Sequence, residues 1–211
     1  FVKDLKDKKV LDLGCGGGIF SHLLYKAGTK VIGVDYASAA VEFAKNRYPG
    51  IDFQEDSIYN LSGFADQSFD LVVMMDIIEH LSDQKKALLE VKRILKSGGR
   101  IVMSTDYNDS YWNSGIFNRF FWFSMRFSKD GRAYRLIKET ESKIPSKKYY
   151  NASHIGLRSF EELDQLVSSA GFELIRHEVY PLVGVWWRDF IFKILPKRAR
   201  GEHQMLLAKK P

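Results

Sequence analysis

The chain is poor in cysteine and has no long apolar run. Its 211 residues include a single cysteine, Cys15, which excludes an internal disulfide framework and a zinc site built on several cysteines. No stretch reaches the roughly 20 uninterrupted apolar residues that a membrane-spanning helix needs, and no secretory signal pattern is visible. We therefore expect a protein of the reducing cytoplasm.

What is present is the composition of an ordinary globular protein. The residues are 45% hydrophobic and 27% charged, and the length predicts one domain over residues 1–211. Internal repeats and low-complexity tracts are absent from the sequence. The net charge of +6 comes largely from residues 142–150 and 193–201. We interpret these scattered charges as solvated surface rather than as a nucleic-acid or lipid site.

Strand-like and helix-like patterns alternate over the first 105 residues and return near the end. Apolar runs predict strands at 9–14, 30–35, 51–56, 69–76, 100–105, 173–180 and 203–210. Helical spacing predicts helices at 19–28, 38–48 with Ser38 as N-cap, 83–99, and 159–172 with Ser159 and Glu162 as a capping box. The alternation predicts an α/β fold with a parallel, doubly wound sheet.

Polar residues and glycines follow several of these strands. They are Gly14–Gly18, Asp35, Asp56 and Asp76. The carboxyl ends of parallel strands meet at one edge, which is where ligands bind in such sheets. We therefore expect these residues to form one site.

The stretch "VLDLGCGGGIF", residues 10–20, favours one ligand class. Glycines after a first strand allow a ligand to approach the backbone closely, and dinucleotides use the pattern G-x-G-x-x-G. Here the third position of that pattern is Ile19, and Asp12 lies two residues before Gly14. A carboxylate there favours a ligand with an ammonium group over one with a pyrophosphate. S-adenosylmethionine (SAM) carries an ammonium and a sulfonium and no phosphate, so the charge favours SAM over NAD.

Two further carboxylates indicate an adenosine. Asp35 ends the second strand, 21 residues after Gly14, where a carboxylate can accept hydrogen bonds from both ribose hydroxyls. Asp56 could accept a hydrogen bond from the adenine amino group, with help from the backbone of Ser57. The alternative is that Asp56 simply ends a strand.

The motifs "VLDLGCGGG", "VIGVD", "FDLVVMMDIIEHL" and "LKSGGRIVMST" occur in this order over residues 9–105. In this order they resemble the motifs of the class I SAM-dependent methyltransferases, above all the ubiquinone-biosynthesis O-methyltransferase type. The resemblance implies a Rossmann-like sheet of seven strands whose last strand is antiparallel. It also implies a helical cover before the first strand; since eight residues precede Lys9, we expect that cover to be incomplete.

The resemblance also implies SAM as the cofactor and a set of residues that contact it or lie beside it. They are Asp12, Gly14, Gly16, Asp35, Tyr36, Asp56, Ser57 and Met75.

The stretch "DIIEH", residues 76–80, is the main candidate for chemistry. Asp76, Glu79 and His80 share one face if the segment is a helical turn, and they could then bind a divalent cation such as Mg²⁺. In the resembled family the matching positions bind metal, although Asp76 replaces a Glu. Two alternatives stay open. His80, with Glu79, could act as a base or contact the substrate, or both could order the next helix and the cofactor loop.

His154 is a further catalytic candidate because it follows the irregular segment, where relatives also have a histidine. It could face the substrate or anchor the loop. Of the other histidines, His22 fits a helix position, and His177 and His203 fit strand positions without a functional argument.

The alternation of predicted strands and helices is interrupted at residues 106–150, and residues 111–127 are rich in aromatic side chains. We predict an insertion within the single domain that covers the substrate pocket and accommodates an apolar or aromatic acceptor. Residues 183–195, with the basic residues after them, could add a peripheral membrane contact. The alternative is a small helical subdomain whose aromatics pack on one another.

The sequence therefore predicts a methyltransferase that moves a methyl group from SAM to a small-molecule or lipid-like acceptor, at oxygen. The Asn/Asp-Pro-Pro-aromatic motif typical of base methylation is missing after the fourth strand, which counts against a nucleic-acid partner. An RNA or protein methyltransferase and a non-catalytic SAM-binding protein are the alternatives.

Overall fold

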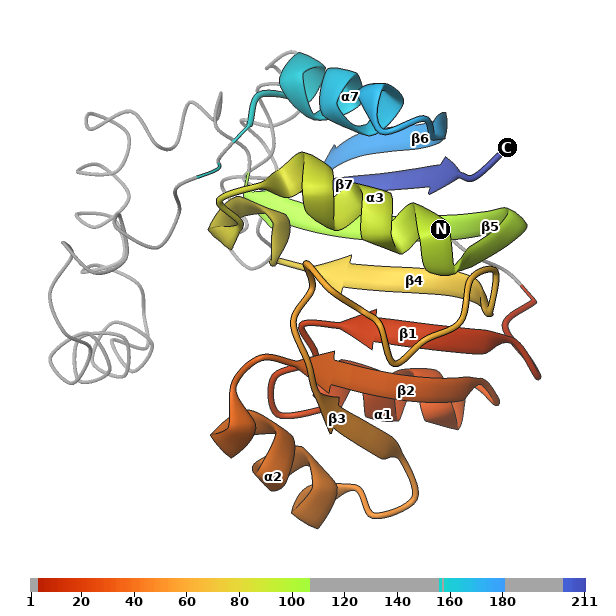
Figure 1. Cartoon of the computed structure of the whole chain (residues 1–211), viewed down its shortest axis with the longest axis vertical. Coiled ribbons are helices and arrows are strands. Elements are labelled where there is room, and N and C mark those ends of the chain that lie inside the picture. Colours follow the sequence, from red (N-terminus) through yellow and green to blue (C-terminus); the bar gives the residue numbers. More distant parts are fainter. Residues whose placement is uncertain (1–3, 107–155, 157, 181–202) are drawn as a thin grey trace, which may run out of the picture.

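The computed structural model describes residues 4–106, 156, 158–180 and 203–211. Strands and helices alternate along the first of these ranges, and the pattern resumes in the last two (Figure 1). In chain order the elements are β1 (Lys9–Leu13), α1 (Ile19–Lys26), β2 (Lys30–Asp35), α2 (Ser38–Arg47), β3 (Asp52–Glu55), β4 (Phe69–Met75), the 3₁₀ turn η1 (Ile78–His80), α3 (Gln84–Ile94), β5 (Leu95–Asp106), α7 (Phe160–Ser169), β6 (Glu173–Tyr180) and β7 (His203–Lys209).

The described strands form one seven-stranded sheet in the order β3-β2-β1-β4-β5-β7-β6. β1 pairs in parallel with β2 and β4, β2 with β3, and β4 with β5, whereas β7 is antiparallel to both β5 and β6. The chain order reverses direction between β1 and β4, as in doubly wound sheets. The predicted α/β sheet with an antiparallel last strand is confirmed.

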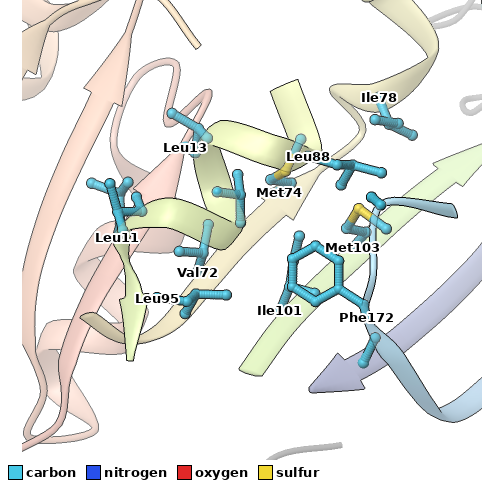
Figure 2. Packing of buried hydrophobic residues seen from close by; sticks show 14 of the residues in the cluster. Leu11, Leu13, Val72, Met74, Ile78, Leu88, Leu95, Ile101, Met103 and Phe172 are labelled. Carbon is cyan, nitrogen blue, oxygen red and sulfur yellow. The ribbon is translucent and has the colours of Figure 1, made fainter. Parts of the chain in front are cut away.

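One face of the sheet is covered by α3, which runs in front of β5 in Figure 1, and by α7, which packs beside α3 and against β6. The two helices bury leucine, valine and isoleucine side chains against the strands because their apolar residues recur at helical spacing. Figure 2 shows part of this core, where Leu88 of α3 and Phe172 lie close to Ile101 and Met103 of β5. All four side chains are buried.

The opposite face carries a second, smaller core under α1 and α2. Leu24 of α1 and Val41 and Ala44 of α2 pack with β-strand residues that include Val10 and Phe53. With apolar side chains on both faces, β1 and β4 are almost entirely buried, as expected for strands inside a parallel sheet.

Several predicted boundaries shift. The helix predicted over 83–99 ends at Ile94, and β5 already begins at Leu95. Ser38 is not the N-cap of α2. The N-cap is Ala37, whose N–H donates to Oδ1 of Asp35 at 2.9 Å, so the side chain that serves this helix start comes from the strand before it. The capping box predicted for α7 is confirmed.

The long connection between β3 and β4 is held by Arg93 of α3. Its guanidinium donates to the carbonyls of Leu61 and Phe64 at 2.8 and 2.9 Å and forms ion pairs with Asp66 and Glu90. The planar guanidinium satisfies two backbone carbonyls that the connection leaves without strand partners. These contacts fasten residues 61–66 of the connection to the last turn of α3.

None of the helices in the described ranges is long and apolar enough to cross a membrane. The predicted insertion over 106–150, apart from Asp106, and the apolar segment over 183–195 lie outside the described residues, as does His154.

Candidate functional site

The carboxyl ends of β1, β2, β3, β4 and β5 meet at one edge of the sheet, on the left in Figure 1. The glycine loop follows β1, Asp35 ends β2, and Asp76 follows β4. The predicted cofactor residues therefore lie along one edge, in the part of a doubly wound sheet where ligands bind. The contacts at each position decide what each can do.

The glycine loop is shaped first by the protein itself. Gly14 has φ +80°, and a Cβ there would overlap Cδ1 and Cγ1 of Ile77. Gly18, with φ +79°, opens α1, and a Cβ there would lie 2.7 Å from Cζ of Phe53. Both positions need glycine because of backbone angle and protein packing. Gly14 and Gly18 therefore have a structural reason to be glycine, apart from the predicted contact with a ligand.

Gly16 differs from its neighbours. Its φ is +50°, and a Cβ built on it would meet no atom within 4 Å. Its N–H donates to Oδ2 of Asp35 at 2.8 Å. The backbone at Gly16 is therefore bare, faces open space and is joined to the carboxylate that ends β2.

Asp35 is held by two backbone donors, the N–H groups of Gly16 and Ala37, one on each carboxylate oxygen. A carboxylate oxygen has two lone pairs, so each oxygen keeps the capacity to accept another hydrogen bond. The side chain is half-buried and already oriented. It is a preorganised double acceptor beside open backbone.

Asp12 lies inside the sheet rather than on its surface. It is 2% exposed and accepts a hydrogen bond of 2.5 Å from the Ser21 hydroxyl of α1. Burial raises its pKa to about 6, against the smaller opposing effect of the Ser21 hydrogen bonds, and the charge of Asp35 raises it further. Burial likewise raises the pKa of the nearby Cys15 thiol to about 12, which makes that thiol a poor nucleophile.

The remaining predicted cofactor residues form the rim of the edge. Asp56 donates its N–H to the Asp35 carbonyl at 3.1 Å, and its Oδ1 accepts from the Ser57 N–H at 2.7 Å. Met75 is half-buried at the end of β4, and Tyr36 is 81% exposed beside Asp35. The backbone bond between Asp56 and Asp35 fixes the two carboxylate-bearing residues next to each other.

The predicted helical turn over residues 76–80 is not formed. Asp76 has φ +54°, the 3₁₀ turn starts only at Ile78, and Oδ1 of Asp76 accepts a 2.7 Å bond from Ser104 of β5. The left-handed backbone breaks the helical phase that would have placed the three side chains on one face. The described residues contain no group of histidine, cysteine or carboxylate side chains that could hold a metal ion. The predicted set of Asp76, Glu79 and His80 thus does not fit a divalent cation.

Glu79 points into the protein and His80 lies at its surface. Glu79 is 2% exposed and accepts a 2.8 Å hydrogen bond from Oγ1 of Thr105. Burial raises the pKa of Glu79, the Thr105 bond lowers it, and the charge of Asp76 raises it again. His80 is exposed at the end of η1.

Three polar residues at this edge were given no functional role from the sequence, although His203 was placed in a strand. Ser104 and Thr105 hold Asp76 and Glu79, and His203 begins β7 with Nδ1 3.3 Å from Oδ1 of Asp106. Polar residues at the end of an otherwise apolar strand, as in "RIVMSTD", are the signal that could have revealed the first two. For His203 the signal was the implied antiparallel last strand, whose beginning must lie at this edge.

Known proteins resemble this chain in sequence over its first half. Residues 11–103 match the methyltransferase domain family. The ubiquinone biosynthesis O-methyltransferase of Coxiella burnetii is 37% identical over 105 residues, which make up 48% of this chain and 44% of that protein. The chain therefore spans less than half the length of this curated relative.

Solved structures resemble nearly the whole chain in fold. A SAM-dependent methyltransferase of Methanosarcina mazei has a TM-score of 0.65 at 22% identity and covers 97% of this chain and 93% of its own. One of Mesorhizobium loti has a TM-score of 0.66 at 17% identity, with 99% and 94% covered. At these identities the likeness shows the fold. Together with the sequence match it confirms the resemblance to class I SAM-dependent methyltransferases.

Proposed function

We propose that this protein binds SAM and transfers its methyl group to a small-molecule or lipid-like acceptor, at a hydroxyl oxygen. The support is the methyltransferase domain match over residues 11–103, the class I fold, and the carboxyl edge built around Asp35 and Gly16. The name of the Coxiella burnetii relative supports oxygen as the acceptor atom. The observation that carries the proposal is the hydrogen bond between Asp35 and the open backbone at Gly16.

The residues at this edge fit SAM. Asp35 offers two oriented carboxylate oxygens to the ribose hydroxyls, and Gly16 leaves room at the backbone beside them. Asp56, Ser57, Met75 and Tyr36 would line the rest of the adenosine site. When ionised, the buried carboxylate of Asp12 would supply a negative charge opposite the ammonium group of SAM.

SAM, when bound, supplies a methyl group that is already electrophilic because the leaving group is cationic. The protein's task is then to place the acceptor oxygen in line with that methyl group and to exclude water. A base is needed only if the oxygen arrives protonated. His80 and His154 remain our candidates for that contact, and Glu79, which is buried, would support the loop that presents His80.

The acceptor side of the proposal rests on residues around the predicted lid over 106–150. Its aromatic composition favours an apolar or aromatic acceptor. A peripheral membrane contact through residues 183–195 is part of the same proposal and would suit a lipid-like acceptor.

The test begins with the cofactor. Isothermal titration should show SAM binding to the wild type, and Asp35→Ala should weaken it by at least about tenfold because two charge-assisted hydrogen bonds are lost. Asp52→Ala on β3 is the matched control, since the Asp52 carboxylate is exposed and accepts a hydrogen bond from the side chain of Gln54. Binding of NAD in place of SAM, or unchanged SAM affinity in Asp35→Ala, would contradict the assignment.

The second step is turnover. Release of S-adenosylhomocysteine should be measured with a panel of hydroxyl acceptors, for which we name catechol, protocatechuate and caffeate. Methylation of at least one supports the proposal. Tight SAM binding without turnover on the panel would favour the non-catalytic alternative.

A further inference from the structure

His203 opens β7 at the carboxyl edge of the sheet. Because β7 is antiparallel to β5, its first residue pairs with the last residue of β5, and the register places His203 opposite Asp106. This brings the imidazole to the same edge as Asp76 and Ser104, which precede it by 127 and 99 residues in sequence. Two strands, β4 and β5, lie between β7 and β1, which the glycine loop follows, so His203 is on the side of the edge beyond β4.

Two carboxylates lie near the same nitrogen of the His203 imidazole. Its Nδ1 is 3.3 Å from Oδ1 of Asp106 and 4.0 Å from Oδ1 of Asp76. Asp76 is itself fixed by the Ser104 hydroxyl, which donates to the same oxygen at 2.7 Å. The side chain of His203 is 37% exposed, so a ligand can reach the ring.

These contacts determine which ring nitrogen meets a ligand. An ionised carboxylate can only accept hydrogen bonds, so both neighbours of Nδ1 favour the tautomer with its hydrogen on Nδ1. In the neutral ring the lone pair then lies on Nε2. A hydroxyl group that donates its hydrogen is the chemical group that matches this nitrogen.

The other histidine near this region does not offer such a nitrogen. His177 has Nδ1 at 2.7 Å from Asp164 and Nε2 at 3.0 Å from Gln204, and its side chain is 2% exposed. Both ring nitrogens of His177 are therefore engaged in hydrogen bonds within the protein. His203 is therefore the accessible imidazole on β6 and β7 within the described residues.

We propose that His203 is a binding residue for the methyl acceptor, whose hydroxyl donates a hydrogen bond to Nε2. Asp106 and Asp76 hold the ring in the orientation and tautomer that make this bond. The inference rests on the proposed function and deepens it, because it makes an acceptor with a donating hydroxyl the preferred substrate class. It assigns to β7 a role that the sequence pattern did not indicate.

The experiment compares variants of the whole chain with the acceptor that the wild type methylates in the panel above. His203→Phe keeps the ring size and removes both nitrogens, whereas His203→Gln restores a polar group near the place of Nε2. His22→Phe on α1 is the control, since that ring stacks on Tyr48 elsewhere in the molecule. SAM affinity, KM and kcat are measured for each, together with acceptor binding to protein saturated with S-adenosylhomocysteine.

The expected result is a rise of about tenfold in both the acceptor KM and its dissociation constant in His203→Phe, as for the loss of one hydrogen bond. His203→Gln should recover part of the lost acceptor affinity. In both variants the SAM affinity should stay within about twofold of the wild-type value, because the cofactor residues are unchanged. The binding measurement needs no turnover, so it separates acceptor contact from chemistry.

Unchanged acceptor binding in His203→Phe, or an equal effect of His22→Phe, would overturn the inference while leaving the proposed function intact. An effect on SAM affinity as large as that on the acceptor would overturn it too, since the residue would then be structural. A wild type that methylates none of the panel contradicts the proposed function itself, and the inference falls with it.

Discussion

Gln204 of β7 accepts a hydrogen bond from His177 of β6, whose Nε2 lies 3.0 Å from Oε1 of the amide. The amide nitrogen of Gln204 donates to the carbonyls of Asp106 and Arg158 at 3.3 and 3.0 Å. The two carbonyls fix the orientation of the Gln204 amide. If the amide were flipped, its oxygen would face two carbonyl oxygens, which can only accept hydrogen bonds. One buried side chain thus joins the backbone on both sides of the predicted insertion to the last two strands.

Replacing Gln204 tests how much this junction contributes. Gln204→Leu keeps the volume but leaves two carbonyls and the His177 ring nitrogen unpaired at a position that is 1% exposed. We expect the free energy of unfolding to fall by about 2–4 kcal/mol, as for buried polar groups without partners. Urea unfolding measures it. Gln54→Leu, which removes a bond to exposed Asp52, is the control, and an equally small loss in both variants would contradict the prediction.

Two glycines of the same loop should respond differently to alanine. Gly14→Ala combines a left-handed backbone with an overlap on Ile77, so we expect a loss of at least about 3 kcal/mol in unfolding free energy. Gly16→Ala has the left-handed angle but open space, so its loss should be about 1 kcal/mol.

SAM titration completes this comparison. The Cβ in Gly16→Ala would enter the open space where we propose the cofactor, so SAM affinity should fall by about tenfold or more in a protein that stays folded. A Gly16→Ala variant with full SAM affinity would show that the open space is not part of the cofactor site.

Much of the fold followed from local pattern. Apolar runs such as "FDLVVMM" bury both faces of a strand, and Ser159 with Glu162 marks a helix start through contacts three residues apart. These signals depend on neighbours in sequence, so the sequence alone was enough. The end of α3 was harder to predict. Leu95 continues the helical spacing of apolar residues, but it pairs with Phe69 of β4 and so belongs to β5.

The sequence predicted at which edge of the sheet the candidate residues lie, but not the directions in which their side chains point. The edge of the sheet follows from topology, whereas the direction of Glu79 depends on Thr105, which is 26 residues away. The positive φ of Asp76 has no sequence signal, since aspartate adopts it only occasionally. Contacts between residues far apart in sequence therefore keep Asp76, Glu79 and His80 from sharing one face and bring His203 to this edge.

The raised pKa of Asp12 makes part of the stability depend on pH. The folded protein holds this proton up to about pH 6 and the unfolded chain only to 3.8, so the folded state binds more protons in between. The contribution of Asp12 is then fully present below about pH 4 and falls as pH rises through about 6, by roughly 3 kcal/mol.

Asp12→Asn should remove this dependence. The amide keeps an acceptor for Ser21 and cannot ionise, so the variant gains stability over the wild type as pH rises from about 4 to about 7. Urea unfolding of both proteins across this range measures the difference, and Asp52→Asn serves as the exposed control. A constant difference between Asp12→Asn and the wild type would contradict the raised pKa. Weaker SAM binding in Asp12→Asn would place its charge near the ammonium group.

Glu79 offers a last prediction, which separates a structural role from a catalytic one. Burial raises its pKa, so its ionisation also costs stability as pH rises. Glu79→Gln still accepts from Thr105 and should be at least as stable as the wild type at alkaline pH, by thermal unfolding. We expect its turnover to stay within about threefold, and to be insensitive to excess chelator, because a carboxylate 2% exposed is poorly placed to contact the acceptor. A loss of about 100-fold in Glu79→Gln with an unchanged melting temperature would instead make Glu79 a base.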